Sequence, residues 1–187
     1  MQLIPVFKIG ILNAWIFVAL YFLIPFSIML INKEAYKKLG NRPSMNKREK
    51  VIGNIDNIII YIASLYSIFL PFKLETAWFY IGLFIFILGL SILTIATINF
   101  LTTPLNLSVT TGIYHYSRNP LYFATFLIFL GIGIATASWI ILLAAIIFLI
   151  LTNSLINSEE RYCKEKYGDT YKEYLNRTPK WIGTPKL

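Results

Sequence analysis

Long apolar runs alternate with short polar segments along the whole chain. Five of these runs approach the roughly 20 residues that a helix needs to cross the hydrocarbon core of a membrane. They cover about residues 9–31, 51–72, 77–98, 121–137 and 138–157. Because lipid offers no partner to backbone polar groups, helices are the expected form of such runs. The pattern therefore predicts an all-α integral membrane protein with about five transmembrane helices.

The organisation of the second half follows from where its apolar runs end. The last two runs meet at residues 136–138, which predicts a tight helical hairpin. Polar residues begin at 158, and we expect the last helix to continue through them until Gly168 stops it. We predict one transmembrane domain, with three spans in residues 1–98 and a motif-bearing loop, the hairpin and a cytoplasmic helical tail in residues 99–187.

Composition strengthens the membrane prediction. Hydrophobic residues make up 57% of the chain and charged residues only 14%, too few to cover a water-facing surface. The excess of 17 Lys plus Arg over 9 Asp plus Glu lies in loops beside apolar runs, with no basic domain that indicates nucleic-acid binding. The single cysteine, Cys163, excludes an internal disulfide and a cysteine-based metal cluster, and we expect no metal.

The positions of the basic residues predict the orientation. Residues 32–50 hold seven Lys or Arg, the tail from residue 158 holds seven more, and Arg118 adds one, whereas only Lys8 and Lys73 fall on the other side. Because basic loops stay in the cytoplasm, we expect the N-terminus outside and the C-terminus in the cytoplasm. Both polar segments of the second half then face the cytoplasm.

The first of these segments, residues 112–122, reads GIYHYSRNPLY. Gly112 gives the backbone the freedom that a close approach to a ligand needs, and Pro120 suits the first turn of the next helix. Free N–H groups at that helix start, beside Arg118 and Asn119, form a cradle for a carboxylate or phosphate. The alternative interpretation is a plain helix start with a snorkelling arginine and an interfacial belt of tyrosines.

The second segment begins with Glu159 and Glu160, directly after an apolar run. At that depth a carboxylate loses hydration and usually has a partner. The two side chains point about 100° apart on a helix, so we expect one of them to face the bundle. A solvated helical extension is the alternative. We interpret His115 as a loop residue and Cys163 as a packing residue.

Together the two segments carry a resemblance. The pattern G-x-Y-x-x-x-R-N/H-P-x-Y, an apolar hairpin, and then E-E followed by Y-G-x-x-Y-x-x-Y covers about residues 101–182. It resembles the integral-membrane methyltransferases related to isoprenylcysteine carboxyl methyltransferase and the phospholipid methyltransferases. The resemblance implies a membrane enzyme that binds S-adenosylmethionine at the cytoplasmic ends of its last helices and accepts a lipophilic methyl acceptor from the bilayer.

The resemblance also implies the residues of the site. Carried over by position, eight residues would line the cofactor site: Gly112, Tyr114, Arg118, Asn119, Pro120, Tyr122, Glu159 and Glu160. Of these, Arg118, Asn119 and Glu159 are implied as the catalytic residues. Asn119 stands where the carboxyl methyltransferases typically have His, which favours a phospholipid or another small lipid over an isoprenylcysteine-like acceptor.

Two other function classes remain open on the sequence. One is an NADPH-dependent membrane reductase of the sterol-reductase type, whose C-terminal region shares the pattern C-x-x-K-Y-G at residues 163–168. The other is a non-catalytic lipid-binding membrane protein. Titration with S-adenosylmethionine and with NADPH separates these hypotheses.

Overall fold

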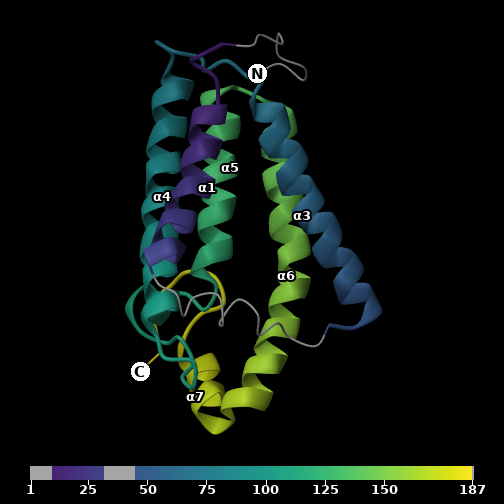
Figure 1. Ribbon diagram of the computed structural model, residues 1–187, viewed down its shortest axis with the longest axis vertical. Coiled ribbons are helices and arrows are strands. Elements are labelled where there is room, and N and C mark those ends of the chain that lie inside the picture. The colour runs from purple at the N-terminus through teal and green to yellow at the C-terminus, as the bar shows by residue number, and fades with distance from the viewer. Residues whose placement is uncertain (1–9, 32–44, 187) are drawn as a thin grey trace.

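The computed structural model describes residues 10–31 and 45–186, and the regular elements in these residues are helices (Figure 1). They are α1 (Trp15–Ile31), α3 (Lys47–Ser67), α4 (Ala77–Thr102), α5 (Pro120–Ala135), α6 (Trp139–Tyr167) and α7 (Asp169–Arg177), with a 3-10 turn η1 (Gly112–His115). One isolated backbone bridge joins Asn13 and Pro71. The predicted all-α class is confirmed.

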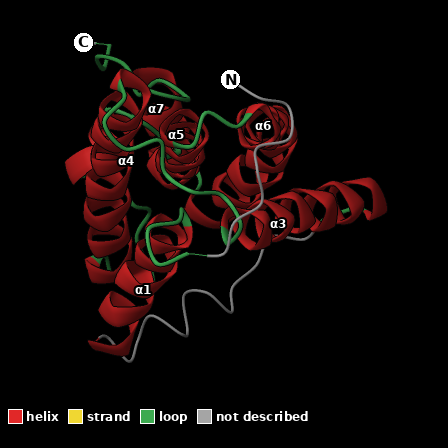
Figure 2. Cartoon of the chain, turned by 90° about the horizontal axis from the view of Figure 1, so that it is seen from above, coloured by secondary structure: helices red, strands yellow, loops and turns green. Residues whose placement is uncertain are grey.

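Helices α1, α4, α5 and α6 run along the long axis of the molecule, α3 is inclined to them, and α7 lies at one end (Figure 1). Seen along that axis, α5 lies between α4 and α6, and α3 packs against α6 (Figure 2). The first helix, α1, contacts both α4 and α3. The loop before α5 and the tail after α6 therefore lie at the same end, as the resemblance requires.

The prediction of about five membrane-spanning helices is confirmed only in part. By length and composition, α4 and α6 can cross a membrane. The apolar helices α1 and α5 have 17 and 16 residues, so each is about 25 Å long against a hydrocarbon core of about 30 Å. Helix α3 has 21 residues but begins with four charged ones and carries Asp56 within its length. Two spans are thus supported where about five are predicted.

The ends of two predicted spans also differ from the structure. The first helix begins at Trp15 rather than at residue 9, and the second ends at Ser67 rather than at residue 72. The backbone around Asn13 pairs instead with the loop after α3: Ala14 N donates to Leu70 O at 2.9 Å, and Asn13 Nδ2 donates to Ile68 O at 2.8 Å. Tertiary pairing has replaced the helical hydrogen bonds there, although the residues are apolar.

The predicted hairpin and helical tail are confirmed. Ala137 has a φ of 53° between α5 and α6, and Ser138 caps α6. Helix α6 continues past its apolar run to Tyr167. Gly168 then has a φ of 61°, a left-handed conformation that ends the helix and lets α7 begin in a new direction.

Small residues bring α4 and α5 into close contact. A Cβ added at Gly82 would lie 2.4 Å from the backbone nitrogen of Ala135, and one at Gly131 would lie 2.7 Å from Gly82 O. Close backbone approach at small residues is the usual way in which membrane helices pack, since lipid supplies no hydrophobic drive between them. Nearby, Phe17 of α1 stacks on Phe86 of α4 with ring centroids 3.9 Å apart. These contacts fix the three helices that support one side of the site.

The outer surfaces of the helices are apolar. Phe84 of α4 is 69% exposed, Ile150 of α6 is 65% exposed and Leu65 of α3 is 63% exposed. Large apolar side chains exposed in this number mark a surface that contacts lipid or another protein rather than water. Since α4 and α6 also satisfy the length of a spanning helix, this surface suits a bilayer.

Candidate active site

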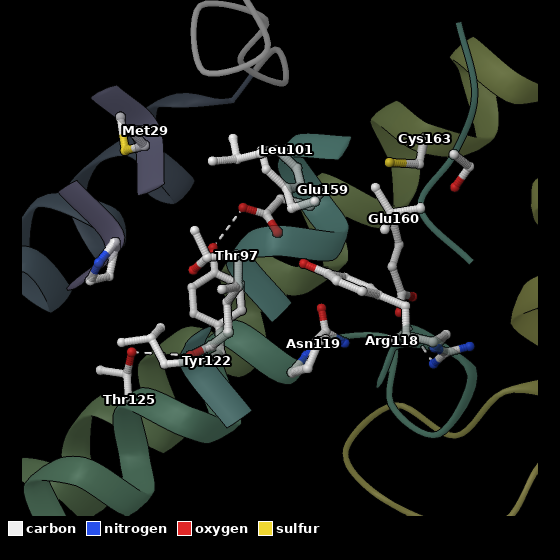
Figure 3. A pocket seen from close by; sticks show the side chains of 18 of the residues that line it. Met29, Thr97, Leu101, Arg118, Asn119, Tyr122, Thr125, Glu159, Glu160 and Cys163 are labelled. Carbon is white, nitrogen blue, oxygen red and sulfur yellow. Dashed lines mark hydrogen bonds and ion pairs between the residues drawn. The ribbon is translucent and has the colours of Figure 1, made fainter. Parts of the chain in front are cut away.

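A cavity of about 860 Å³ lies among α1, α3, α4, α5 and α6 and reaches the loop before α5. Its walls are mostly apolar, and Figure 3 shows Arg118, Asn119, Tyr122, Glu159 and Glu160 among the polar side chains that line it. Small-molecule sites usually measure roughly 300 to 1,000 Å³. The cavity is therefore large enough for a cofactor and part of a second ligand.

The loop between α4 and α5 is anchored to α4 through Asn99. The Asn99 Oδ1 atom accepts a hydrogen bond from Ile113 N at 3.0 Å. Gly112 has a φ of 65°, and a Cβ added there would lie 2.2 Å from the same oxygen. Gly112 is thus required for contact with Asn99, and it does not line the cavity. The sequence analysis predicted that the backbone at Gly112 closely approaches a ligand. In the structure it closely approaches the Asn99 side chain instead.

The tail after α7 fastens the other side of the same loop. Arg118 N donates to Pro179 O at 3.0 Å, and Gly183 N donates to Tyr116 O at 3.0 Å. The Asn119 side chain takes part as well, because its Nδ2 donates to Lys180 O at 2.9 Å. The Asn119 amide oxygen, rather than its nitrogen, is therefore the atom left to meet a ligand.

Two buried tyrosines connect α7 to the loop. Tyr174 OH donates to Tyr114 O at 2.7 Å. Burial raises the pKa of both phenols well above the usual range, so both stay protonated at neutral pH. Tyr174 is consequently a permanent donor that holds the backbone of the loop, and both rings line the cavity.

Arg118 forms an ion pair with Glu160 across the cavity wall. Its Nη2 lies 3.2 Å from Glu160 Oε1, while its Nη1 donates to Leu175 O at 2.8 Å. The geometry of the ion pair is not that of a hydrogen bond, and neither Arg118 Nε nor Glu160 Oε1 has a hydrogen-bond partner among the described residues. The two atoms therefore keep hydrogen-bonding capacity for a ligand, although the side chains are paired by charge.

Glu159 lies on the other side of the group, where Tyr122 OH donates to its Oε1 at 2.6 Å. Figure 3 shows Tyr122 and Glu159 on one side and Arg118 and Glu160 on the other, with Asn119 between them. Both glutamates line the cavity, although we expected only one to face the bundle. Their 100° separation directs them to different partners, one on α5 and one on the preceding loop, and the cavity touches both.

Comparison with protein families gives a match to this region. The sequence model described as phospholipid methyltransferase matches residues 77–170, half of the chain. The chain belongs to the phospholipid methyltransferase family. A comparison with curated proteins finds no significant match. The family match begins with α4, includes the first polar segment and covers the second as far as residue 170. This phospholipid methyltransferase family member therefore has Arg118, Glu159 and Glu160 inside the matched region.

Most of the predicted site residues lie together in the structure. Seven of the eight line the one cavity: Tyr114, Arg118, Asn119, Pro120, Tyr122, Glu159 and Glu160. Gly112 is the exception, since it packs on Asn99. Cys163 also lines the cavity, whereas His115 does not and instead packs edge-on against Tyr116.

Some lining residues escaped the sequence analysis because they lie inside apolar runs. They include Tyr21 of α1, Asp56 of α3 and Thr97 of α4, all outside the two polar segments. A signal did exist for Asp56, since an acidic residue inside a membrane-length apolar run usually has a function. The helices α1 and α3 that carry two of these residues lie outside the family match.

Proposed function

We propose that this protein transfers the methyl group of S-adenosylmethionine to a lipophilic acceptor at the cytoplasmic face of a membrane. The observation that carries the proposal is the cluster of Arg118, Glu159 and Glu160 in a mostly apolar cavity, inside the segment that matches the family. Methyltransferases of this kind need a polar site for the cofactor next to an apolar one for a lipid. The cavity offers both.

The residues present fit the charged groups of the cofactor. Arg118 Nε and Glu160 Oε1 are buried without hydrogen-bond partners among the described residues. The arginine suits the cofactor carboxylate, and a glutamate suits its ammonium group or ribose hydroxyls, through charge-assisted hydrogen bonds. The Asn119 amide oxygen adds a neutral acceptor beside them. When bound, S-adenosylmethionine supplies a methyl group on a sulfonium that a nucleophile can displace.

The chain's own contribution is alignment and exclusion of water. Tyr122 fixes the Glu159 carboxylate through the 2.6 Å hydrogen bond, and the tail fixes Arg118 and Asn119 through the backbone of residues 179–180. In-line displacement needs little acid–base help, so correct placement of the two reactants provides most of the acceleration. The apolar walls keep water away from the reacting groups.

Five membrane passes with the N-terminus outside complete the proposal. The helices α1, α3, α4, α5 and α6 run alternately up and down the long axis, which places the α4–α5 loop and α7 at one end (Figure 1). The charge distribution predicts that this end is cytoplasmic. The short helices α1 and α5 require local thinning of the bilayer or flanking residues at the interface, each at a modest cost.

The proposal is tested first by cofactor binding. Calorimetric titration of the detergent-solubilised protein should show binding of S-adenosylmethionine and none of NADPH. The double variant Arg118→Ala, Asn119→Ala should lose that binding. Binding of NADPH instead would support the reductase alternative and contradict methyl transfer.

Transfer itself is tested with methyl-labelled cofactor. Membranes that contain the protein are incubated with it, and lipids, proteins and volatile products are then separated. Label is expected in the lipid fraction and should fall to background in the double variant. Equal label in both samples, or label in the protein fraction alone, would refute a lipid acceptor.

A further inference from the structure

A second pocket, which we call the α4–α7 groove, lies beyond the end of α4. It measures about 580 Å³ and is lined by the last turn of α4, the loop between α4 and α5, and α7. Leu107, Ser108 and Tyr174 line both the groove and the cavity, so they stand between the two. The charged groups proposed to hold the cofactor do not line the groove, which therefore needs an explanation of its own.

The groove is rich in hydrogen-bond donors. Ser108, Thr110 and Thr111 line it, and neither their backbone N–H groups nor their hydroxyls donate a hydrogen bond to another described residue. A run of unpaired N–H groups next to hydroxyls is the kind of wall that binds an anion with several oxygens. The loop side of the groove thus favours a ligand that accepts hydrogen bonds.

Arg177 adds a positive charge on the α7 side of the groove. Glu173 also lines it, one turn earlier on α7, but the two side chains form no ion pair in the part of the chain that the structure describes. The guanidinium therefore remains available, and its planar fork matches the oxygens of a phosphate. One carboxylate stands against these donors, so a phosphate that carries a further hydrogen-bond donor fits the wall as a whole.

The position of the groove along α4 points to a lipid. Helix α4 has 26 residues and is about 39 Å long against a hydrocarbon core of about 30 Å, so its last residue, Thr102, extends to the depth of lipid headgroups. Thr102 lines the groove. Ile98 and Ile95 precede it by four and seven residues, and Leu88 and Phe84 continue the same helical face. All four side chains are exposed, which gives acyl chains an apolar surface that leads to the groove.

The charge of this end of the chain favours an anionic lipid over a neutral one. The tail from residue 158 carries seven Lys or Arg against five Asp or Glu. Basic residues next to a membrane attract anionic lipids by about 1 kcal/mol each near the surface. An anionic headgroup is therefore concentrated where the groove lies.

We propose that the α4–α7 groove binds the phosphate of an anionic phospholipid with a hydroxylated headgroup, whose acyl chains lie along the exposed face of α4. Arg177 pairs with the phosphate, and the hydroxyls and N–H groups of Ser108, Thr110 and Thr111 donate to its oxygens. Glu173 accepts a hydrogen bond from a headgroup hydroxyl. Such a lipid has no amine and lies on the far side of the wall from the cavity, so it is a bound partner and not a methyl acceptor. The proposal does not depend on methyl transfer.

The test uses three single variants on α7. Arg177→Gln removes the cation of the groove, and Glu173→Gln removes its carboxylate but keeps an oxygen that accepts hydrogen bonds. Lys172→Gln is the matched control, because Lys172 is exposed on the same helix, pairs with Asp169 and does not line the groove. All three side chains are exposed, so we expect an unchanged Tm in the absence of lipid.

Native mass spectrometry of the protein released from detergent counts bound dioctanoylphosphatidylglycerol and gives its affinity. We expect Arg177→Gln to weaken binding about five- to tenfold, through loss of the charge-assisted contact. Glu173→Gln should strengthen binding about two- to threefold, because it removes a repulsive charge at an exposed site. Lys172→Gln should change it less than about twofold. Equal affinity of the wild type and Arg177→Gln, or weaker binding to Glu173→Gln, would overturn the proposal, and the second result is decisive even if Arg177→Gln does not fold.

Three further ligands identify the occupant. Glycerophosphoglycerol carries the headgroup without chains, dioctanoylglycerol carries the chains without a phosphate, and dioctanoylphosphatidylethanolamine replaces the hydroxyls by an amine. All three should bind more weakly than dioctanoylphosphatidylglycerol. Equal binding of glycerophosphoglycerol would make the occupant a soluble phosphate ester, and tighter binding of the ethanolamine lipid would refute an anionic one. None of these results depends on S-adenosylmethionine, so failure here leaves the proposed function to its own tests.

Discussion

The two adjacent glutamates should respond differently to loss of charge. In the wild type, Tyr122 OH donates a hydrogen bond to Glu159 Oε1 at 2.6 Å. Glu159→Gln removes the negative charge but keeps an oxygen that can accept this hydrogen bond. Glu160→Gln removes the partner of Arg118, whose side chain is only 14% exposed and would then carry an unpaired charge. The first variant therefore tests the cofactor contact, and the second tests the ion pair as well.

The expected magnitudes follow from these contacts. Loss of a charge-assisted hydrogen bond to the cofactor costs about 1.5 to 3 kcal/mol, or roughly ten- to a hundredfold in affinity. We expect that loss for Glu159→Gln and a smaller one for Glu160→Gln, because Arg118 already neutralises much of the Glu160 charge. Unpairing Arg118 should cost about 2 kcal/mol of stability in Glu160→Gln, or roughly 4 to 8 °C in Tm for a chain of this size.

Two measurements on the same samples compare the variants in cofactor affinity and in stability. Calorimetry with S-adenosylmethionine reports affinity, and a thermal unfolding assay without cofactor reports stability. Glu159→Gln should bind weakly at an unchanged or slightly higher Tm, because a buried charge has been removed. Glu160→Gln should unfold at a lower temperature. A greater loss of affinity in Glu160→Gln, or unchanged affinity in both variants and in the double variant, would refute the reasoning.

Three further predictions concern the scaffold. Gly82→Val should abolish recovery of folded protein in size-exclusion chromatography, whereas Gly53→Ala, whose added Cβ meets only ordinary van der Waals contact at 3.4 Å, should not. Tyr174→Phe should lower the free energy of unfolding by about 1 to 3 kcal/mol in denaturant titration, since it leaves a buried carbonyl without its donor; an unchanged value would mean that the loop is held by other contacts. In a background without the native cysteine, cysteines placed at Glu75 and Thr184 should be labelled from opposite faces of the membrane, the first from outside; labelling from one face would contradict the five-pass topology.

Much of the helical layout could be predicted because apolar runs and their breaks are local properties of the chain. The hairpin at residues 136–138 and the stop at Gly168 needed no knowledge of tertiary contacts. The errors lie at the ends of the first two runs, where Asn13 and the loop after α3 form cross-chain hydrogen bonds instead of helical ones. Hydropathy cannot distinguish these two uses of an apolar residue.

The site was predictable where its chemistry lies in compact motifs. Arg118 and Glu160 were selected from sequence and meet as an ion pair in the structure. Gly112 illustrates the opposite case, since its left-handed φ was inferred for a ligand but serves a contact with Asn99, a residue inside an apolar run. The docking of the C-terminal tail on residues 116–119 likewise depends on backbone hydrogen bonds, which leave no trace in side-chain patterns.

The division of the cavity between two halves of the chain has a consequence for specificity. Residues 77–170 match the family and supply Arg118, Glu159 and Glu160, the groups that suit a cofactor common to all methyl acceptors. Other lining residues, among them Tyr21 and Asp56, come from α1 and α3, which lie outside the match. A cofactor imposes the same chemistry on every relative, whereas each acceptor imposes its own. Under the proposed function, we therefore expect this chain's choice of acceptor to depend on the part of the cavity that α1 and α3 line.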